Sequence, residues 1–247
     1  MYKPFLFIAS LLLHFHLCAQ PFKTSQLKYE RVKTAYSEKW DGLKKDLVKL
    51  KINPESFELF IRVFKKEKAV EVWLKSKDEK EFKLFKTYSI CSSSGELGPK
   101  RKQGDDQVPE GFYEVSAFNP FSNYYLSLGV SYPNESDRII GKGNLGGDIM
   151  IHGNCVTIGC IPLTDTYIKE VYILAVEAKN NGQTNIPVHI FPTRLDEDGM
   201  KYLNWNSPKD IVLMSFWKNL KVGYDYFELH KMLPKVSVSP KGRYVFN

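Results

Sequence analysis

The sequence predicts a mainly β fold with α additions, an α+β domain with helical flanks at its N- and C-terminal ends. Six or seven short apolar runs have the length and alternation that are typical of strands. One internal segment and both terminal stretches instead place apolar residues at helical spacing. The content of 43% hydrophobic and 14% aromatic residues indicates a folded chain rather than a disordered one.

Residues 1–19 have the pattern of a secretory signal peptide. They combine a basic start, an apolar run from Phe5 to Leu13 and a small residue, Ala19, at the predicted cleavage point. The apolar run is shorter than the span of about 20 residues that crosses a bilayer. We therefore expect an exported protein with no stable membrane span after cleavage. A retained anchor and a lipid-anchored Cys18 are the alternatives.

The predicted elements follow in order along the chain. Residues 20–55 form a helical N-terminal segment that ends at Asn53-Pro54. Residues 56–76 form a hairpin whose turn is the charged run from Lys65 to Lys68. Further strands are expected at 82–91, 112–117, 124–130, 149–151 and 187–191, with a loop at 132–147.

Two helical regions complete the pattern. One helix is expected from Asp165 to Lys179, because apolar residues recur at helical spacing and Asn181-Gly182 stops it. From Asp196 onward the spacing is helical again, and Pro208 to Asp210 open a helix that runs to about Leu220. The chain therefore divides into a central domain at 56–193 and a helical C-terminal extension at 194–247 that packs on it.

The charge of the chain is modestly basic, with a formal net charge of +7. Such a charge suits an acidic surface such as a cell-wall polymer. The sequence has no nucleic-acid-binding motif, and secretion argues against a nucleic-acid partner.

Three cysteines follow the predicted leader: Cys91, Cys155 and Cys160. An odd number in an oxidising compartment leaves at least one thiol unpaired or paired with another chain. Cys91 lies in a strand-like run, so it is predicted to be a small buried apolar residue. A disulfide between Cys155 and Cys160 is one open alternative for the other two.

The residues that carry chemistry lie between positions 149 and 164. His152 and Cys160 are eight residues apart, and a hairpin of that length can bring an imidazole next to a thiol. A thiolate attacks carbonyl groups, and a neighbouring His takes the thiol proton and returns it to the leaving group. Gly153 and Gly159 let the backbone approach a substrate, so the amides of Gly159 and Cys160 are candidate oxyanion donors.

Other readings of this segment stay open on spacing alone. A lone Cys is often core filling, and a lone His is often structural. A metal site would use His152, Cys155 and Cys160 with a fourth ligand from His189 or His230. The paired ligand spacing of metal sites is absent, so no metal is expected.

Several motifs together resemble one known family. They are His152-Gly153 followed by Thr157-x-Gly159-Cys160, the Pro-x-Gly-aromatic element in Val108–Tyr113, the segments Ser92–Lys100 and Tyr132–Asn134, and the C-terminal segments Phe216–Leu220 and Gly223–Phe227. The chain resembles the L,D-transpeptidase (YkuD-type) catalytic domain, in the branch that includes the enzyme detaching a lipoprotein from the cell wall. The resemblance covers roughly Phe57 to the C-terminus. It implies an L,D-transpeptidase-like β-sandwich or barrel as the catalytic domain at 56–193.

The resemblance also implies roles for individual residues. Cys160 matches the nucleophile, His152 the general base, and Gly153 the residue whose carbonyl orients the His ring. The thiolate would attack the diaminopimelate carbonyl of a peptidoglycan stem peptide and form a thioester, which an amine or water releases. The implied partners are stem peptides and a wall-linked lipoprotein, in the periplasm of a Gram-negative-type cell. No cofactor is expected.

Two departures from the commoner family pattern bear on the reaction. Ile158 stands where that pattern has His, and Pro162 stands where it has an Arg that holds a substrate carboxylate. We therefore expect hydrolysis, as an L,D-carboxypeptidase or endopeptidase, with transpeptidation as the alternative. A non-catalytic wall-binding module is the alternative from another class, and a sortase-like transpeptidase fits the short His–Cys interval poorly.

Four further residues are candidate substrate contacts: Arg101, Arg138, Tyr132 and Thr157. Guanidinium groups bind the carboxylates of stem peptides well, and the alternative is an ordinary solvated surface. The segment Gly141–Gly146 matches the letters of a dinucleotide-binding motif. It follows a loop and leads into a strand, so we expect only a flexible rim there.

Overall fold

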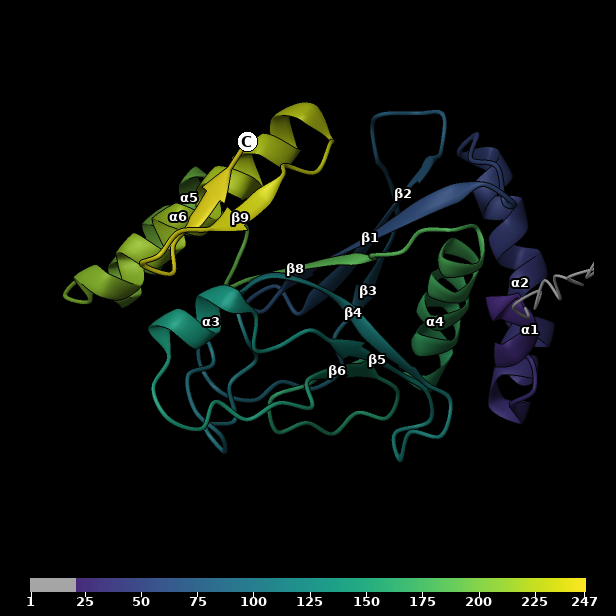
Figure 1. Ribbon diagram of the computed structural model, residues 1–247, viewed down its shortest axis with the longest axis horizontal. Helices are drawn as coiled ribbons and strands as arrows, with labels where there is room; N and C mark the ends of the chain where they lie inside the picture. Colours follow the sequence, from purple (N-terminus) through teal and green to yellow (C-terminus); the bar gives the residue numbers. More distant parts are fainter. Residues whose placement is uncertain (1–20) are drawn as a thin grey trace, which may run out of the picture.

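The computed structural model describes residues 21–247 (Figure 1), and the predicted leader lies outside these residues. The sheet is a single curled, mixed layer of eight strands in the order β3-β2-β1-β8-β4-β5-β6-β7. Its strands are β1 Phe57–Phe64, β2 Ala69–Ser76, β3 Lys83–Ser89, β4 Gly111–Asn119, β5 Ser127–Val130, β6 Met150–His152, β7 Ile161–Pro162 and β8 Pro187–Phe191. The α+β class predicted from the sequence is confirmed.

Helices precede, interrupt and follow the strands along the described chain. They are α1 Phe22–Gln26, α2 Glu30–Lys49, α3 Glu135–Ile140, α4 Asp165–Asn180, α5 Glu197–Asn206 and α6 Ile211–His230, and a small hairpin of β9 Val236–Val238 and β10 Tyr244–Phe246 follows. Thr164, Asp196 and Asp210 cap α4, α5 and α6, because each side-chain oxygen accepts a backbone N–H of the first turn.

Helix α3 lies inside the segment 132–147 that was predicted to be a loop, and that prediction was wrong. The helix has only six residues, which is too short for an apolar periodicity to show. Its sequence signal is a reciprocal cap, in which Asn134 accepts the Asp137 N–H and Asp137 accepts the Asn134 N–H.

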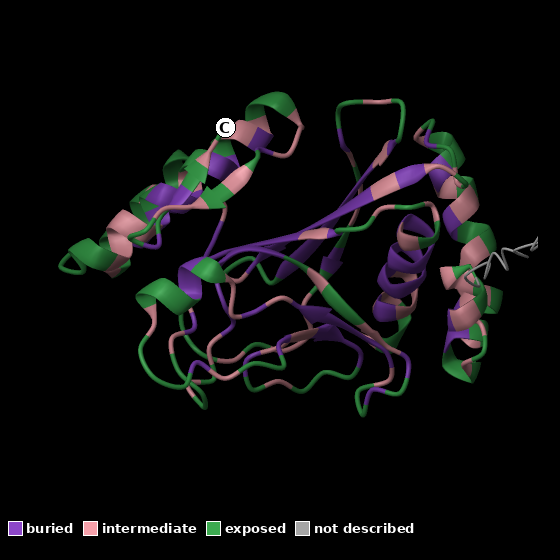
Figure 2. Ribbon diagram, viewed as in Figure 1, coloured by how far each residue is buried: buried purple, intermediate pink, exposed green. Residues whose placement is uncertain are grey.

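The main core lies between the sheet and helices α2 and α4. Figure 2 shows most of α4 buried, and residues 171–178 are buried without interruption, which explains the continuous apolar run from Val171 to Val176. Its apolar side chains pack against strands such as β1, whose Leu59, Ile61 and Val63 are fully buried. The strands β5 to β7 lie at one edge of the sheet, and β6 carries His152 there.

The C-terminal elements α5, α6 and β9 gather on the side of the molecule opposite α1 and α2 (Figure 1). A second apolar cluster joins them to the sheet through Phe64, Phe112, Phe191, Trp217 and Leu220. Packing of the extension on the sheet is therefore a feature of the structure. The boundaries assigned to the separate domains stay a prediction.

Strands β6 and β7 are parallel, with Ile151 opposite Ile161 and His152 opposite Pro162. The hairpin expected between His152 and Cys160 was therefore wrong, since a hairpin would pair the strands antiparallel. The connecting loop 153–160 doubles back before β7 starts. Asn154 at φ 62° and Gly159 at φ 120° supply the left-handed backbone that this reversal requires.

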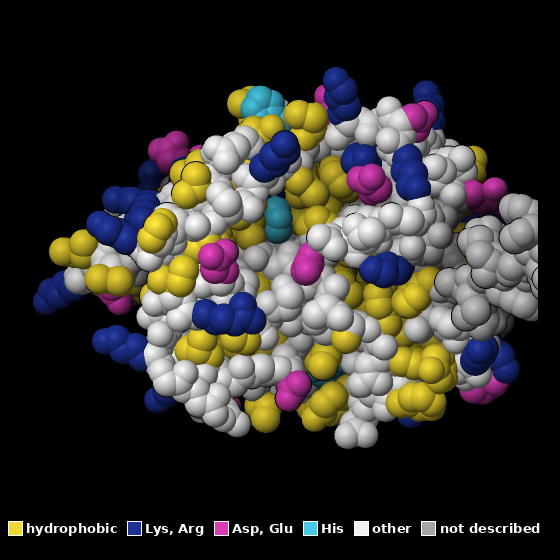
Figure 3. All heavy atoms as spheres, in the orientation of Figure 1, with side chains coloured by type: hydrophobic (Ala, Val, Ile, Leu, Met, Phe, Trp, Pro, Cys, Tyr) yellow, Lys and Arg dark blue, Asp and Glu magenta, His cyan; other side chains and the backbone are white. Residues whose placement is uncertain are grey.

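Within residues 21–247 no helix has the combination of length and apolar character that crossing a membrane requires. Figure 3 shows Lys and Arg side chains spread over the viewed face, with acidic side chains between them. This face therefore has no continuous basic stripe of the kind that tracks a nucleic-acid backbone.

The buried His189 of β8 predicts an acid-sensitive stability. Its ring lies 4.6 Å from the rings of both Phe60 and Phe112, and Arg62 is its register partner on β1. Burial, assisted by the Arg62 charge, lowers the pKa of His189 from 6.5 to about 3. The unfolded chain therefore binds one more proton than the native protein between these pH values, so stability falls as the pH drops through them.

The measurement is the free energy of unfolding in urea at about pH 7 and about pH 4.5. As the pH falls through this window, the free energy of unfolding decreases in both proteins. We expect the decrease per pH unit to be smaller in His189→Gln than in the wild type, by up to about 1.4 kcal/mol. The matched control is His230→Gln, because His230 is exposed at the end of α6. Equal acid slopes for the wild type and His189→Gln would contradict the prediction.

Candidate active site

The loop 153–160 fixes the backbone of Cys160 before the side chain is considered. The Thr157 hydroxyl accepts the Cys160 N–H at 2.8 Å and donates to the Cys160 carbonyl at 2.8 Å. Thr157 was predicted to contact substrate. In the structure its hydroxyl instead closes a turn that positions the nucleophile candidate.

The N–H groups of Gly159 and Cys160, the two candidate oxyanion donors, differ in whether an acceptor already occupies them. The Cys160 N–H is occupied by the Thr157 hydroxyl, which corrects the expectation that both amides are available. Gly159 is buried, and no acceptor within residues 21–247 pairs with its N–H. A buried amide without an acceptor is costly unless a ligand or water satisfies it, so Gly159 is the better candidate of the two.

His152 is held from both sides because β6 lies between β5 and β7. Its register partners are Ser127 and Pro162, and its carbonyl accepts the Leu163 N–H at 2.7 Å. The ring Nδ1 lies 2.5 Å from the Gly153 carbonyl. A carbonyl only accepts, so Nδ1 carries the hydrogen and Nε2 presents a lone pair. This tautomer is the one that can take a proton from a thiol.

Cys160 directly precedes β7, the strand that pairs in parallel with β6, which carries His152. The register places Ile161, the residue after Cys160, opposite Ile151, the residue before His152. The candidate nucleophile therefore lies at the start of the strand next to the one that carries the candidate base.

The sulfur of Cys160 lies between two backbone groups. The thiol donates to the Asp148 carbonyl at 3.5 Å, and the Met150 N–H hydrogen-bonds the sulfur. Burial raises the pKa of the Cys160 thiol above its usual 9.0, with the Asp148 charge acting in the same direction. Burial also lowers the pKa of His152 from 6.5. Both groups are therefore neutral at rest, and the thiol must lose its proton during the reaction.

A cavity of about 120 Å³ opens beside Cys160. One wall is the segment Ser92–Leu97, and the floor is apolar, with Val63, Ile90 and Ile161. The Ser94 hydroxyl is buried and has no hydrogen-bond partner within residues 21–247. A buried hydroxyl of this kind is available to a polar group that enters the cavity.

Cys91 and Cys155 form a disulfide, and Cys160 is free. The prediction that Cys91 is merely a buried apolar residue was wrong, and so was the alternative that pairs Cys155 with Cys160. The sulfur of Cys155 is also unavailable to the metal site that was considered above. The disulfide joins the end of the β3 region to the loop 153–160, so it ties together two sides of the cavity that Cys160 lines.

A buried ion pair between Lys65 and Glu110, of which only Glu110 belongs to a sequence motif, supports another part of the cavity lining. Lys65, at the end of β1, donates to the carbonyls of Gly98 and Val108 and to the Glu110 carboxylate. Glu110 also accepts the Trp217 Nε1–H of α6. The motif Val108–Tyr113 showed this glutamate, but nothing near it in sequence indicated that a lysine from β1 and a tryptophan from α6 converge on it.

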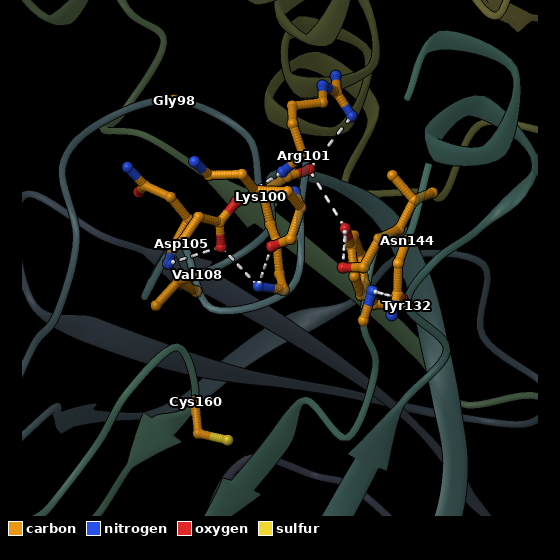
Figure 4. Close-up of polar contacts among 12 residues, drawn as sticks. Gly98, Lys100, Arg101, Asp105, Val108, Tyr132, Asn144 and Cys160 are labelled. Carbon is orange, nitrogen blue, oxygen red and sulfur yellow. Dashed lines mark hydrogen bonds and ion pairs between the residues drawn. The ribbon is translucent and has the colours of Figure 1, made fainter. Parts of the chain in front are cut away.

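The structure does not bring the other predicted substrate contacts to the cavity. Figure 4 shows the Arg101 side chain directed away from Cys160, where it binds Asp137 at 2.8 Å and lies over the Phe216 ring. Arg138 is exposed in α3. The Tyr132 hydroxyl is buried within hydrogen-bond distance of the carbonyls of Lys100 (3.3 Å) and Leu145 (3.2 Å), which share its one hydrogen, so this residue joins two loops. The buried Asp137 explains the position of Arg101, since an unpaired buried carboxylate is costly.

The region that contains the site matches a known protein family. The model of the YkuD family, described as the L,D-transpeptidase catalytic domain, matches residues 59–190. The chain belongs to this family. The matched region contains His152, Cys160 and the whole cavity, and membership implies an L,D-transpeptidase-type activity.

Curated relatives and solved structures are similar to this family member. The protein named "Putative L,D-transpeptidase YafK" of Escherichia coli (strain K12) is 40% identical over 189 residues, which are 76% of this chain and 73% of that protein. The helical cell shape determining protein Pgp2 from Campylobacter jejuni has a TM-score of 0.43 at 20% identity, over 75% of this chain and 74% of that one. Bd1075 of Bdellovibrio bacteriovorus has a TM-score of 0.40 at 20% identity, over 74% and 75%.

Proposed function

We propose that this protein is an exported cysteine acyl-enzyme that hydrolyses peptidoglycan at the diaminopimelate carbonyl of stem peptides. Cys160 is the nucleophile and His152 the general base. The observation that carries the proposal is the imidazole tautomer, because the Gly153 carbonyl fixes the hydrogen on Nδ1 and leaves Nε2 to accept the thiol proton. Family membership supports the substrate class.

The proposed reaction has two halves. In the first, the Cys160 proton moves to His152 Nε2 as sulfur bonds to the carbonyl carbon, and the electron pair of the C=O bond moves to oxygen near the Gly159 N–H. The C–N bond then breaks, and His152 returns the proton to the leaving amine. In the second, water gives a proton to Nε2 and its oxygen bonds to the thioester carbon. The C–S bond breaks, and the sulfur takes the proton back.

Pro162 favours water over an amine as the acceptor. It stands where the commoner family pattern has an Arg, and it is buried in β7 with His152 as its register partner. The site therefore has no cation at that position to hold the carboxylate of a second peptide. Arg101 does not replace it, because that guanidinium is bound to Asp137.

Export of the chain has two supports. Residues 1–19 have the pattern of a signal peptide. The Cys91–Cys155 disulfide is of the kind that persists in oxidising compartments and is rare in the cytosol. The proposed location is the periplasm. A wall-linked lipoprotein is a proposed substrate of the same thioester chemistry.

Digestion of purified sacculi followed by muropeptide analysis tests the proposal. We expect the wild type to shorten tetrapeptides or to release wall-bound protein, and Cys160→Ala to do neither. The Cys160→Ser variant keeps the side-chain volume and is expected to lose most of the turnover, because a neutral hydroxyl is a much weaker nucleophile.

Three results are distinguishable in this experiment. New direct links between diaminopimelate residues would show that transpeptidation is the reaction. Identical muropeptide profiles for the wild type and Cys160→Ala would exclude catalysis. Binding to sacculi in that case would leave a wall-binding module as the function.

A further inference from the structure

The loop between β4 and β5, residues 120–126, is the neighbour of His152 on the side away from β7. The Tyr124 ring lies against the His152 ring, with centroids 4.7 Å apart and planes 32° apart. A Cβ atom on Gly153 would meet the Tyr124 carbonyl at 2.9 Å, so this carbonyl touches the residue that orients the imidazole. The Gly153 N–H donates to the Leu126 carbonyl at 3.1 Å. One loop thus contacts both the base and its orienting residue.

This loop has an unusual backbone conformation, and Arg31 of helix α2 contacts it. Tyr125 has φ 70°, which is an unfavourable backbone region for a residue with a Cβ. The Arg31 Nη1 atom donates to the Ser122 carbonyl and to the Tyr125 carbonyl, each at 2.6 Å. Its guanidinium also lies 5.6 Å from the Tyr125 ring centroid. Arg31 therefore clamps the two residues that flank the dipeptide containing Tyr124.

Helix α2 reaches the same loop at two further points. The Tyr29 ring, at the N-cap of α2, meets the Phe121 ring edge to face at 4.8 Å. Lys169 of α4 lies over the Tyr125 ring and pairs with Glu38 of α2 at 2.7 Å. The helical N-terminal segment is thus attached to the loop that contacts the base, although it lies outside the matched family region 59–190.

We propose that Arg31 is a positioning residue for His152 and acts through the 120–126 loop. This inference rests on the proposed function, in which His152 takes the proton of Cys160. The guanidinium stabilises the strained Tyr125 backbone, and this places the Tyr124 ring and carbonyl against His152 and Gly153. Loss of the clamp lets the loop relax, and the imidazole then loses the fixed orientation that proton transfer requires.

The test compares Arg31→Met with Lys33→Met. Lys33 lies two residues further along the same helix, is exposed and pairs with Glu30. The first measurement is the rate of Cys160 alkylation by iodoacetamide across pH, which needs no peptidoglycan. We expect Arg31→Met to slow alkylation near neutral pH by about tenfold, toward the rate of His152→Ala, because misplacing a catalytic group by about 1 Å has effects of this size or larger. Lys33→Met is expected to react at the wild-type rate.

The second measurement is turnover, with kcat and KM separated. We expect Arg31→Met to lower kcat with KM unchanged, and Arg31→Lys, which keeps a donor, to restore part of the rate. Tyr124→Ala is expected to match Arg31→Met, and the double variant to be no slower than either single variant, because both changes act through one loop. Tyr124→Phe keeps the ring contact with His152 and is expected to be faster than Tyr124→Ala.

Two outcomes would overturn the inference. One is a wild-type alkylation profile for Arg31→Met. The other is a lower thermal stability of Arg31→Met with an unchanged rate per folded molecule, which indicates that Arg31 only docks the helix. Absence of muropeptide turnover in the wild type would overturn the proposed function instead, and the alkylation comparison would still decide the role of Arg31.

Discussion

Replacing His152 with Ala is expected to lower kcat/KM for stem-peptide turnover by about 10²- to 10⁴-fold at neutral pH. The size follows from the resting state of the pair. Burial raises the pKa of Cys160 above 9.0, so few molecules carry a thiolate at neutral pH without a base. His152, whose pKa burial lowers below 6.5, is neutral there and can accept the proton.

The pH profile separates this role from a structural one. In the wild type the acid limb should lie below pH 6.5, because a lowered His pKa keeps the base neutral to lower pH. In His152→Ala the rate should rise steeply above pH 9.0, as the thiol ionises without help. Steady-state kinetics across pH measure both limbs.

His152→Gln serves as a second variant that fills the space of the imidazole, and His230→Ala, at the exposed end of α6, serves as the matched control. Wild-type turnover in both His152 variants would contradict the assignment.

Local signals in the sequence were sufficient for much of the fold. The hairpin expected at 56–76 is β1 and β2, because alternating apolar residues and a charged turn specify it within a short window. The helix expected from Asp165 is α4, whose stripe of apolar residues faces the sheet. By contrast, β7 has only two residues and exists because Ile161 and Pro162 pair with β6. No local pattern encodes a strand of that length.

The residues of the site also fall into two groups, those that a local sequence motif indicates and those that only the fold brings together. The motif around His152 and Cys160 is local, so the sequence could indicate the dyad, although its roles stay predictions. Other residues around it lie outside the motif: Asp148 and Tyr124 contact the pair, and Lys65 supports the cavity wall. Their types are ordinary for loops and strand ends. Only the folded chain shows which of them meet the dyad.

The disulfide is the clearest case of a contact that the sequence could not assign, since three cysteines allow several pairings. It also predicts the largest effect on stability. Replacing Cys91 and Cys155 together by Ser is expected to lower the free energy of unfolding by about 4 kcal/mol, because the cross-link closes a loop with a sequence separation of 64 residues and restricts the unfolded chain. For a protein of this size such a loss corresponds to a fall in Tm of roughly 8–16 °C.

The double replacement should also lower kcat at temperatures where the protein is still folded. Cys91 precedes the Ser92–Leu97 wall of the cavity, and Cys155 lies in the loop that carries Cys160, so both sides gain freedom when the bond is lost. Urea unfolding measures the stability, and kcat well below the lowered Tm measures the effect on the site.

Alkylation of the unreduced, denatured wild type is the control, and it should modify only Cys160 among these three cysteines. Modification of all three before reduction would show that the bond does not form. Equal stability of the wild type and the double variant would show that the bond does not restrict the unfolded chain.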